Sequence, residues 1–197
     1  MFVSAIYGLG NPGKEYEFTR HNTGFRVVDA LAKRLGAEFR KDAALRGEFA
    51  KARFGSAGTL WLGKPLTFMN LSGECVGAHA RYHKLDFSTV AVVYDDIALP
   101  VGAVKISQGG GDGGHNGIKS VIRCCGNAFI RFRVGIGAKP FREQPLADFV
   151  LGKLGDEEKN IFETRQANFI QGLELLISQG LSAAQNLINR KDNNERP

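Results

Sequence analysis

The period of the hydrophobic pattern changes several times along the chain, and each change predicts a different element. Residues 90–94 form an unbroken, valine-rich apolar run, which is typical of a strand covered on both faces. Residues 48–54 alternate between polar and apolar positions, and residues 59–62 supply a partner strand across a glycine turn at 55–58. Shorter apolar stretches predict further strands at residues 2–8, 101–107 and 129–136.

Helical spacing separates these strands. Apolar residues between Phe25 and Leu35 recur with a helical period, and Gly36 ends that helix. Weaker helical patterns cover residues 71–84 and 118–124. The last third of the chain is expected to be helical, with a long helix capped by Asp156 and ended by Gly180, and a short helix from Ser182. Strands interleaved with helices predict an α/β protein with a twisted mixed sheet flanked by helices.

The length of 197 residues and the 43% hydrophobic content suit one core, so residues 1–190 are expected to form a single domain. Residues 191–197 read as a disordered polar tail. The longest apolar run has five residues, whereas a membrane helix needs about 20. We find no export signal, and the odd number of cysteines favours a reducing cytoplasm over a disulfide framework.

The positive charge is concentrated in one stretch. The chain carries a net charge of +6, and residues 101–142 contain seven basic residues but only one acid, which accounts for the whole excess. A concentrated positive field attracts polyanions such as nucleic acids. A solvated surface that aids solubility is the alternative interpretation.

A glycine motif follows the first strand, where residues 8–13 read Gly-Leu-Gly-Asn-Pro-Gly. A dinucleotide-binding fold would begin its helix at once and end its next strand with an acid about 20 residues later. Here a polar segment intervenes, and Asp29 lies inside the predicted helix. The motif therefore predicts a tight turn with close backbone contact, and a nucleotide-dependent oxidoreductase is disfavoured.

The sequence surroundings of His21 differ from those of His79 and His83. His79 and His83 have helical spacing but no third zinc ligand nearby, so a surface helix face is expected and no metal site. His21 lies in a polar segment between the glycine turn and a helix start. Asp95 and Asp96 end the buried strand, and one of them can orient a histidine from there, although a simple turn acid is equally compatible.

Two further segments carry polar groups at strand-to-helix turns. Residues 113–117 read Gly-Gly-His-Asn-Gly, and such a glycine-rich helix entry can bind phosphate or an oxyanion. Residues 64–73 place an aromatic ring, a methionine and an amide together.

Taken together, these motifs resemble one family, the bacterial-type peptidyl-tRNA hydrolases. The resemblance covers residues 8–24, 65–73, 95–102, 109–117, 129–137 and 149–152, in one order over about three quarters of the chain. It implies a monomeric cytoplasmic enzyme without cofactor or metal. Such an enzyme hydrolyses the ester between a peptide and the 3′ end of tRNA.

The resemblance also implies roles for individual residues. His21 is the expected catalytic base, Asp95 its partner, and Asn11 the residue that distinguishes N-blocked from free aminoacyl groups. The expected contacts to the peptide or tRNA are Tyr16, Phe68, Met69, Asn70, Asn116, Lys105, Arg131 and Arg133.

The chain also departs from the family pattern. Tyr94 stands where relatives often have histidine, Ser107 where some have lysine, and residues 138–140 read Ala-Lys-Pro within a loop of unassigned role. The main alternative function is a non-catalytic RNA-binding protein on the same fold. The presence of His21, Asp95 and the asparagines argues against it.

Overall fold

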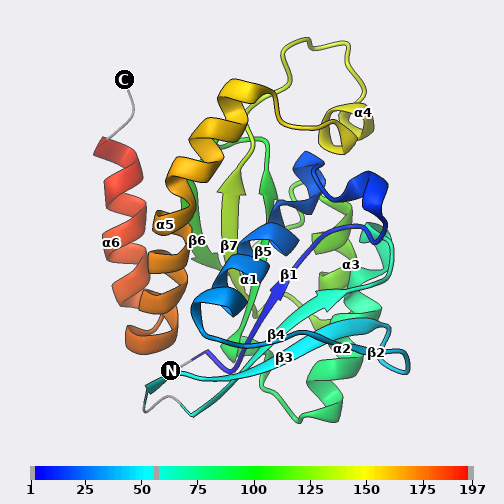
Figure 1. Ribbon diagram of the computed structural model, residues 1–197, viewed down its shortest axis with the longest axis vertical. Coiled ribbons are helices and arrows are strands. Elements are labelled where there is room, and N and C mark those ends of the chain that lie inside the picture. The colour runs from blue at the N-terminus through cyan, green and yellow to red at the C-terminus, as the bar shows by residue number, and fades with distance from the viewer. Residues whose placement is uncertain (1–2, 56–57, 195–197) are drawn as a thin grey trace.

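A computed structural model describes residues 3–55 and 58–194 of the chain, with side chains as far as residue 189. Its described strands build one seven-stranded sheet (Figure 1). The strands are β1 Ala5–Gly8, β2 Arg40–Asp42, β3 Gly47–Arg53, β4 Thr59–Pro65, β5 Val90–Asp96, β6 Val104–Gln108 and β7 Ile130–Gly135. Their order across the sheet is β2-β3-β4-β1-β5-β7-β6.

The sheet is mixed, as the hairpin pattern predicts. The four central strands β4, β1, β5 and β7 run parallel to one another. Both edges are antiparallel, because β2, β3 and β4 form a meander and β6 pairs antiparallel with β7. The carboxyl ends of β1 and β5 therefore lie side by side at one edge of the sheet, where ligand sites of open α/β sheets collect.

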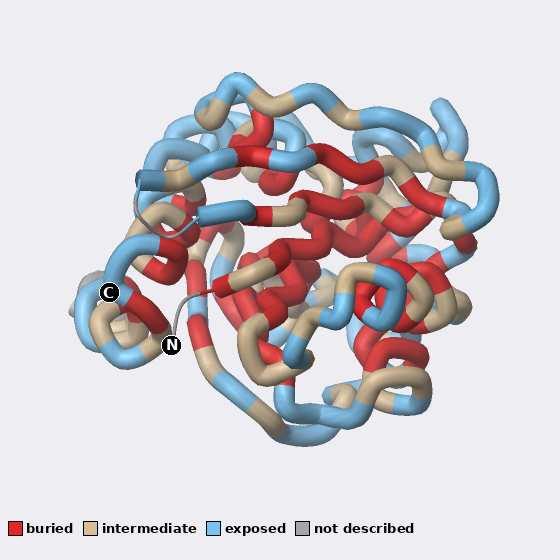
Figure 2. Tube along the Cα trace, turned by 90° about the horizontal axis from the view of Figure 1, so that it is seen from below, coloured by how far each residue is buried: buried red, intermediate tan, exposed pale blue. Residues whose placement is uncertain are grey.

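Helices cover both faces of the sheet. They are α1 Thr23–Arg34, α2 Ser72–Tyr82, α3 Asn116–Cys125, α4 Leu146–Leu151, α5 Asp156–Gln179 and α6 Leu181–Asn194. Helices α1, α5 and α6 contribute to the core on one face, and α2 and α3 to the core on the other. Figure 2 shows the buried strands enclosed between these exposed outer layers.

Strand β5 shows why its sequence lacks alternation. Ala91 and Val93 belong to the first core, whereas Val90, Val92 and Tyr94 belong to the second. A strand with apolar contacts on both faces gains from an apolar side chain at every position. The prediction of a doubly covered strand is confirmed.

Two elements were not expected, and two expectations need correction. The polar edge strand β2 and the six-residue helix α4 were not expected, because each is too short to show a hydrophobic period. Helix α5 is capped by Gly155, whose N–H donates to Glu158 Oε2 at 2.8 Å, and Asp156 is the first helical residue. Helix α6 continues to Asn194, so part of the expected tail is helical, and its residues 195–197 lie outside the description.

Two other expectations also fall partly outside the described residues, namely the start of the first strand at residue 2 and the hairpin turn at residues 56 and 57. Among the helices described, none has the length and apolar character needed to cross a membrane.

Candidate active site

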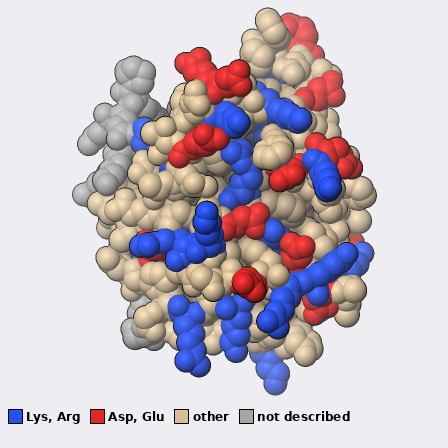
Figure 3. Space-filling model, viewed as in Figure 1, with Lys and Arg blue, Asp and Glu red and all other residues tan. Residues whose placement is uncertain are grey.

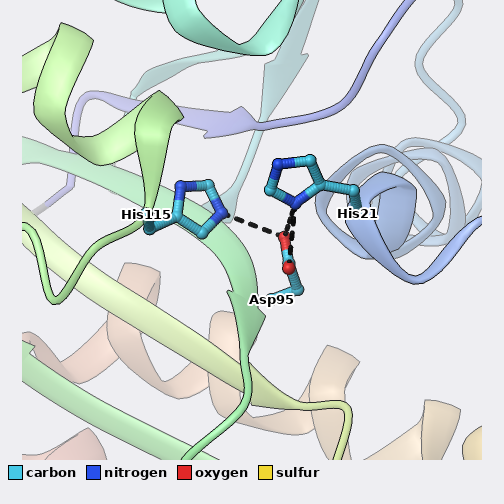
Figure 4. A group of neighbouring side chains, drawn as sticks. All are labelled: His21, Asp95 and His115. Carbon is cyan, nitrogen blue, oxygen red and sulfur yellow. Dashed lines mark hydrogen bonds and ion pairs between the residues drawn. The ribbon is translucent and has the colours of Figure 1, made fainter. Parts of the chain in front are cut away.

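Three segments that are far apart in sequence meet beyond the carboxyl ends of β1 and β5. The 3₁₀ turn η2 (Arg20–Asn22) carries His21, the end of β5 carries Asp95, and the residue before α3 is His115. His21 Nδ1 lies 3.0 Å from both carboxylate oxygens of Asp95, and His115 Nε2 lies 3.0 Å from Asp95 Oδ1 (Figure 4). One carboxylate thus holds two imidazoles.

Close backbone packing brings His21 to this position. A Cβ at Gly24 would lie 2.4 Å from Leu9 N and Val93 O, and a Cβ at Gly8 would lie 2.3 Å from Gly24 O. Glycine at both positions lets the start of α1 rest directly on the ends of β1 and β5. The glycine motif therefore serves helix-to-strand contact, as the sequence predicts, and this contact sets η2 beside Asp95.

The hydrogen bonds of His115 fix its tautomer. Its Nδ1 accepts from the backbone N–H groups of Gly117 and Ile118, at 3.1 and 3.2 Å, and so caps α3. A nitrogen that accepts two hydrogen bonds carries no proton, so the proton resides on Nε2 and is donated to Asp95. His115 was not among the expected site residues, although a polar side chain at a glycine-rich helix entry is a signal for one.

Asp95 is ionised at the centre of this group. Burial raises the pKa of Asp95, but the charges of His115 and His21 and their hydrogen bonds outweigh burial and hold the pKa well below its usual range. Asp96 has different partners: its Oδ2 lies 2.5 Å from Arg133 Nε, and its Oδ1 accepts from Ala98 N. The structure therefore places Asp95, and not Asp96, against His21.

A cavity of about 760 Å³ opens beside the two histidines. It is bounded by the end of β5, by the loop of residues 109–114 and by helix α4, which contributes Leu146 and Val150. Of the expected site residues, four line this cavity besides Asp95, namely His21, Asn116, Arg131 and Arg133. Its size suits a segment of peptide or a nucleoside.

Asn11 is held by a second asparagine. Asn22 accepts a hydrogen bond from Asn11 N at 2.8 Å and donates one to Asn11 O at 2.9 Å, so the backbone of Asn11 is fixed at both ends. Asn11 Oδ1 accepts from Met69 N at 2.7 Å, which leaves Nδ2 as the side-chain donor for a further partner. Sequence reasoning placed Asn22 in the motif around His21 but gave it no role.

The remaining expected contacts of the peptide or tRNA end differ in exposure. Phe68 is 56% exposed, and its ring meets Tyr16 edge to face at 6.5 Å. Asn70 and Asn116 are exposed at the starts of their helical segments. Met69 is buried, so its backbone N–H, which orients Asn11, is the part of it that bears on the site.

The three expected basic contacts fall into two groups. Lys105 is exposed on β6 and stands directly opposite Arg133 of β7. Arg131 shares the cavity-facing side of β7 with Arg133, as their spacing predicts, but its side chain is buried and bonded to backbone carbonyls. Arg131 therefore differs from the exposed phosphate contact that the sequence led us to expect.

On the face drawn in Figure 3, side chains of the two charges gather in different places. Figure 3 shows basic side chains gathered where β3 and β4 run, and acidic ones more frequent where α4 leads into α5. Residues outside the basic window thus add local fields of both signs to this face.

The expectation of a surface face for His79 is wrong. His79 is 1% exposed, stacks on Phe49 at 3.9 Å and lies within 2.7 Å of the Tyr7 hydroxyl through its Nδ1. Burial, followed by the neighbouring His83, lowers the pKa of His79 to about 4. Helical spacing gave the correct element but no information about which side faces the sheet.

Cys75 is buried, and Cys124 and Cys125 are half-buried. Burial raises the pKa of the Cys75 and Cys125 thiols to about 12, which removes the reactive thiolate at neutral pH.

Two imidazoles and a carboxylate offer the donor set of a divalent metal site, since their ligand atoms all lie within 4.8 Å of one another. A metal at His115 Nε2 would have to displace the proton there. That proton cannot move to Nδ1 without breaking the two hydrogen bonds from backbone N–H groups that cap α3. The arrangement is therefore better matched to proton chemistry than to metal binding.

Comparisons with known proteins identify the family. The family model described as peptidyl-tRNA hydrolase matches residues 5–196. A peptidyl-tRNA hydrolase of Geobacillus kaustophilus is 50% identical over 158 residues, which cover 80% of this chain and 83% of that protein. One from Anaeromyxobacter sp. (strain K) is 44% identical over 192 residues, with 96% and 97% covered.

Solved structures agree. The crystal structure of peptidyl-tRNA hydrolase from Acinetobacter baumannii superposes with a TM-score of 0.89 at 32% identity, with 95% of this chain and 94% of that chain covered. These relatives do not favour the alternative of a non-catalytic RNA-binding protein. The chain therefore belongs to the peptidyl-tRNA hydrolase family and is a carboxylic ester hydrolase that acts on peptidyl-tRNA.

Proposed function

We propose that His21 is the general base of the ester hydrolysis and that Asp95 orients it. The observation that carries this proposal is the contact of His21 Nδ1 with the ionised, buried Asp95. With its Nδ1 proton donated to Asp95, neutral His21 keeps a lone pair on Nε2 for the proton of a water molecule. General-base assistance of this kind contributes about 10²- to 10⁴-fold.

The reaction needs no other nucleophile. As His21 removes the proton, the water oxygen bonds to the ester carbonyl carbon and the carbonyl oxygen becomes an oxyanion. The oxyanion collapses, the bond to the ribose oxygen breaks, and the imidazolium returns its proton to that oxygen. An asparagine amide aimed at the oxyanion would contribute roughly 3 kcal/mol.

Asn11 selects N-blocked substrates in this proposal. Its Nδ2 donates to the carbonyl of the first peptide group, because Oδ1 is bonded to Met69 N. A free aminoacyl ester carries an ammonium group and lacks that acceptor. An unpaired polar group of this kind costs about 1–3 kcal/mol.

The exposed and half-buried residues of the site contact the substrate in two places. Tyr16, Phe68, Asn70 and Asn116 meet the peptide or the tRNA 3′ end. Lys105 and Arg133 stand opposite each other on adjacent strands, and phosphate oxygens of the tRNA backbone suit such a pair. We further infer that the chain works as a monomer in the cytoplasm, where it recycles tRNA from prematurely released peptidyl-tRNA.

Release of peptide from purified peptidyl-tRNA, with and without a chelator, tests the reaction, and Asn11→Ala tests selectivity. We expect turnover that survives chelation and, in Asn11→Ala, a smaller ratio of rates for N-blocked and free aminoacyl-tRNA. Restoration of a chelated enzyme by one divalent ion would refute the metal-free mechanism. Equal losses on both substrates would make Asn11 a general positioning residue. Size-exclusion chromatography with light scattering tests the monomer.

A further inference from the structure

The glycine-rich loop of residues 109–114 lies beside the catalytic group yet has almost no packing of its own. A Cβ placed on Gly110, Gly111, Gly113 or Gly114 would meet no heavy atom within 4 Å. Gly109, Gly110, Gly113 and Gly114 all have positive φ, a conformation that glycine adopts at low cost. Hydrogen bonds rather than side-chain packing must hold this loop in one shape.

Arg131 supplies two of those hydrogen bonds. Its Nη1 donates to Gly111 O and its Nη2 to Gly110 O, each at 2.6 Å. Its guanidinium also lies 4.8 Å from the centroid of the Phe129 ring, and the residue is only 4% exposed. The planar guanidinium thus donates hydrogen bonds to two successive carbonyls from a fixed position on β7.

The loop that Arg131 holds leads directly into two residues of the site, His115 and Asn116. Asp112 O accepts from His115 N at 3.0 Å, and His115 in turn donates to Asp95. The His115 ring also meets Tyr94 edge to face at 5.1 Å. Burial raises the pKa of Tyr94, and the neighbouring Arg131 guanidinium, which lines the same cavity, opposes that effect. Hydrogen bonds and the chain itself therefore connect Arg131 through the loop to His115 and Asn116.

Burial leaves Arg131 poorly placed to contact a phosphate. The residue is only 4% exposed, and two of its N–H groups already donate to backbone carbonyls. Lys105 is exposed, and Arg133, although bonded to Asp96, is more open than Arg131. The three basic residues of this face therefore divide into two that are open to solvent and one that is buried.

We propose that Arg131 is a positioning residue: it fixes the glycine-rich loop and thereby aims His115 and Asn116 at the substrate. The proposal rests on the hydrolase activity of the family. It replaces the phosphate contact expected from the sequence. It also makes the shape of an otherwise unpacked loop depend on Arg131, together with the hydrogen bond from Gly114 N to Asp112 Oδ1 within the loop.

Two substitutions of Arg131 separate this role from a phosphate contact. Arg131→Lys keeps the charge but cannot bond both carbonyls, so we expect kcat to fall about tenfold on peptidyl-tRNA and on a minimal substrate, an N-blocked aminoacyl ester of a single nucleoside. Arg131→Gln removes the charge, and we expect the slope of log(kcat/KM) against log[salt] to stay at the wild-type value. Arg133→Gln, as the contrasting variant, should raise KM for peptidyl-tRNA and reduce that slope by about 1. Arg34→Lys, in a surface ion pair with Glu174, is the control for an ordinary arginine replacement.

The opposite pattern would overturn the proposal, namely full activity in Arg131→Lys with a reduced salt slope in Arg131→Gln. If the Arg131 variants fail to fold, Gly110→Ala tests whether the shape of the loop matters for catalysis. This substitution strains a residue at φ +97°, and the added Cβ meets no neighbouring heavy atom within 4 Å. We expect the same loss of kcat on both substrates, and full activity of Gly110→Ala would refute the loop's importance. Wild-type enzyme is assayed first, because a wild type without turnover would refute the hydrolase itself rather than the role of Arg131.

Discussion

The chain has four histidines, and the fold divides them into two pairs with opposite surroundings. His21 and His115 share the ionised carboxylate of Asp95 at the edge of a cavity. His79 and His83 lie among aromatic rings at the other end of α2 from the candidate site residue Asn70, and His83 stacks on Trp61 at 4.1 Å. The first pair contacts a buried negative charge, and the second has no carboxylate in hydrogen-bond contact among the described residues.

Hydrogen bonding sharpens the contrast. The Tyr7 hydroxyl, whose pKa is raised by burial, shares a hydrogen bond with His79 Nδ1. The other ring nitrogen, Nε2, has no hydrogen-bond partner among the described residues. An imidazole inside a ring stack with one unpaired nitrogen is suited to packing, whereas one that is bonded to a carboxylate through a single nitrogen, as His21 is, is suited to accept a proton. Environment, and not residue type, separates the two pairs.

Replacing His21 should produce the largest effect on activity. We expect His21→Ala to lower kcat about 10²- to 10⁴-fold, because it removes the base, while tRNA binding and thermal stability stay near wild type. Single-turnover hydrolysis, filter binding and calorimetry measure the three quantities.

The carboxylates give the matched pair for this test. Asp95→Asn should be impaired but less so than His21→Ala, and Asp96→Asn less still. Greater damage from Asp96→Asn would mean that the wrong carboxylate has been assigned.

His79 should dominate the pH dependence of stability in mildly acidic solution. Its pKa is about 4 in the folded state and 6.5 as the ordinary value, so the unfolded chain binds the proton more readily. Stability from this residue is full above pH 6.5 and is lost as the pH falls towards 4, by about 3 kcal/mol. Asp95, whose pKa is lowered, loses its contribution only at more acidic pH, because its ordinary value is 3.8.

Urea unfolding of wild type and His79→Phe between pH 7 and pH 4.5 measures this contribution. The phenylalanine keeps a ring against Phe49 but cannot take up a proton, so its stability should fall less steeply as the pH is lowered. Parallel curves for the two proteins would show that His79 is not the titrating group.

Replacing His115 should lower activity by a smaller factor. His115→Asn retains a residue that caps helices well, but it removes the hydrogen bond to Asp95. A hydrogen bond to a charged group contributes about 1.5–3 kcal/mol, so we expect kcat to fall roughly tenfold or more with little change in melting temperature. A stable variant with wild-type kcat would confine His115 to capping α3.

His83 should matter least. It is only partly buried, and its main contact is the stack on Trp61. We expect His83→Ala to cost about 1 kcal/mol in unfolding free energy and to leave kcat unchanged, as measured by urea unfolding and the same hydrolysis assay. A loss of activity comparable to that of His115→Asn would break the division into two pairs.

Local pattern determined the elements and much of the site. The apolar run of β5 and the alternation in β3 predicted their strands, because burial on two faces or one leaves a direct imprint on the sequence. The motifs around His21, Asp95 and Asn11 were sufficient to name the expected base, its partner and the selecting amide. Short elements such as β2 and α4 were not predicted, since a hydrophobic period cannot be recognised in so few residues.

Tertiary structure decided which side chains meet. The hydrogen bond of His115 to Asp95 depends on the path of residues 109–114 from β6 into α3. The hydrogen bonds of Arg131 to Gly110 and Gly111 depend on the register of β6 against β7. The burial of His79 depends on which face of α2 lies on the sheet. These contacts join residues about 20 or more positions apart, and a local pattern fixes the type of an element but not its rotation or its neighbour. That is why the sequence alone pointed to His21 as the expected base, while only the fold showed the hydrogen bonds that hold His21 and the glycine-rich loop in place.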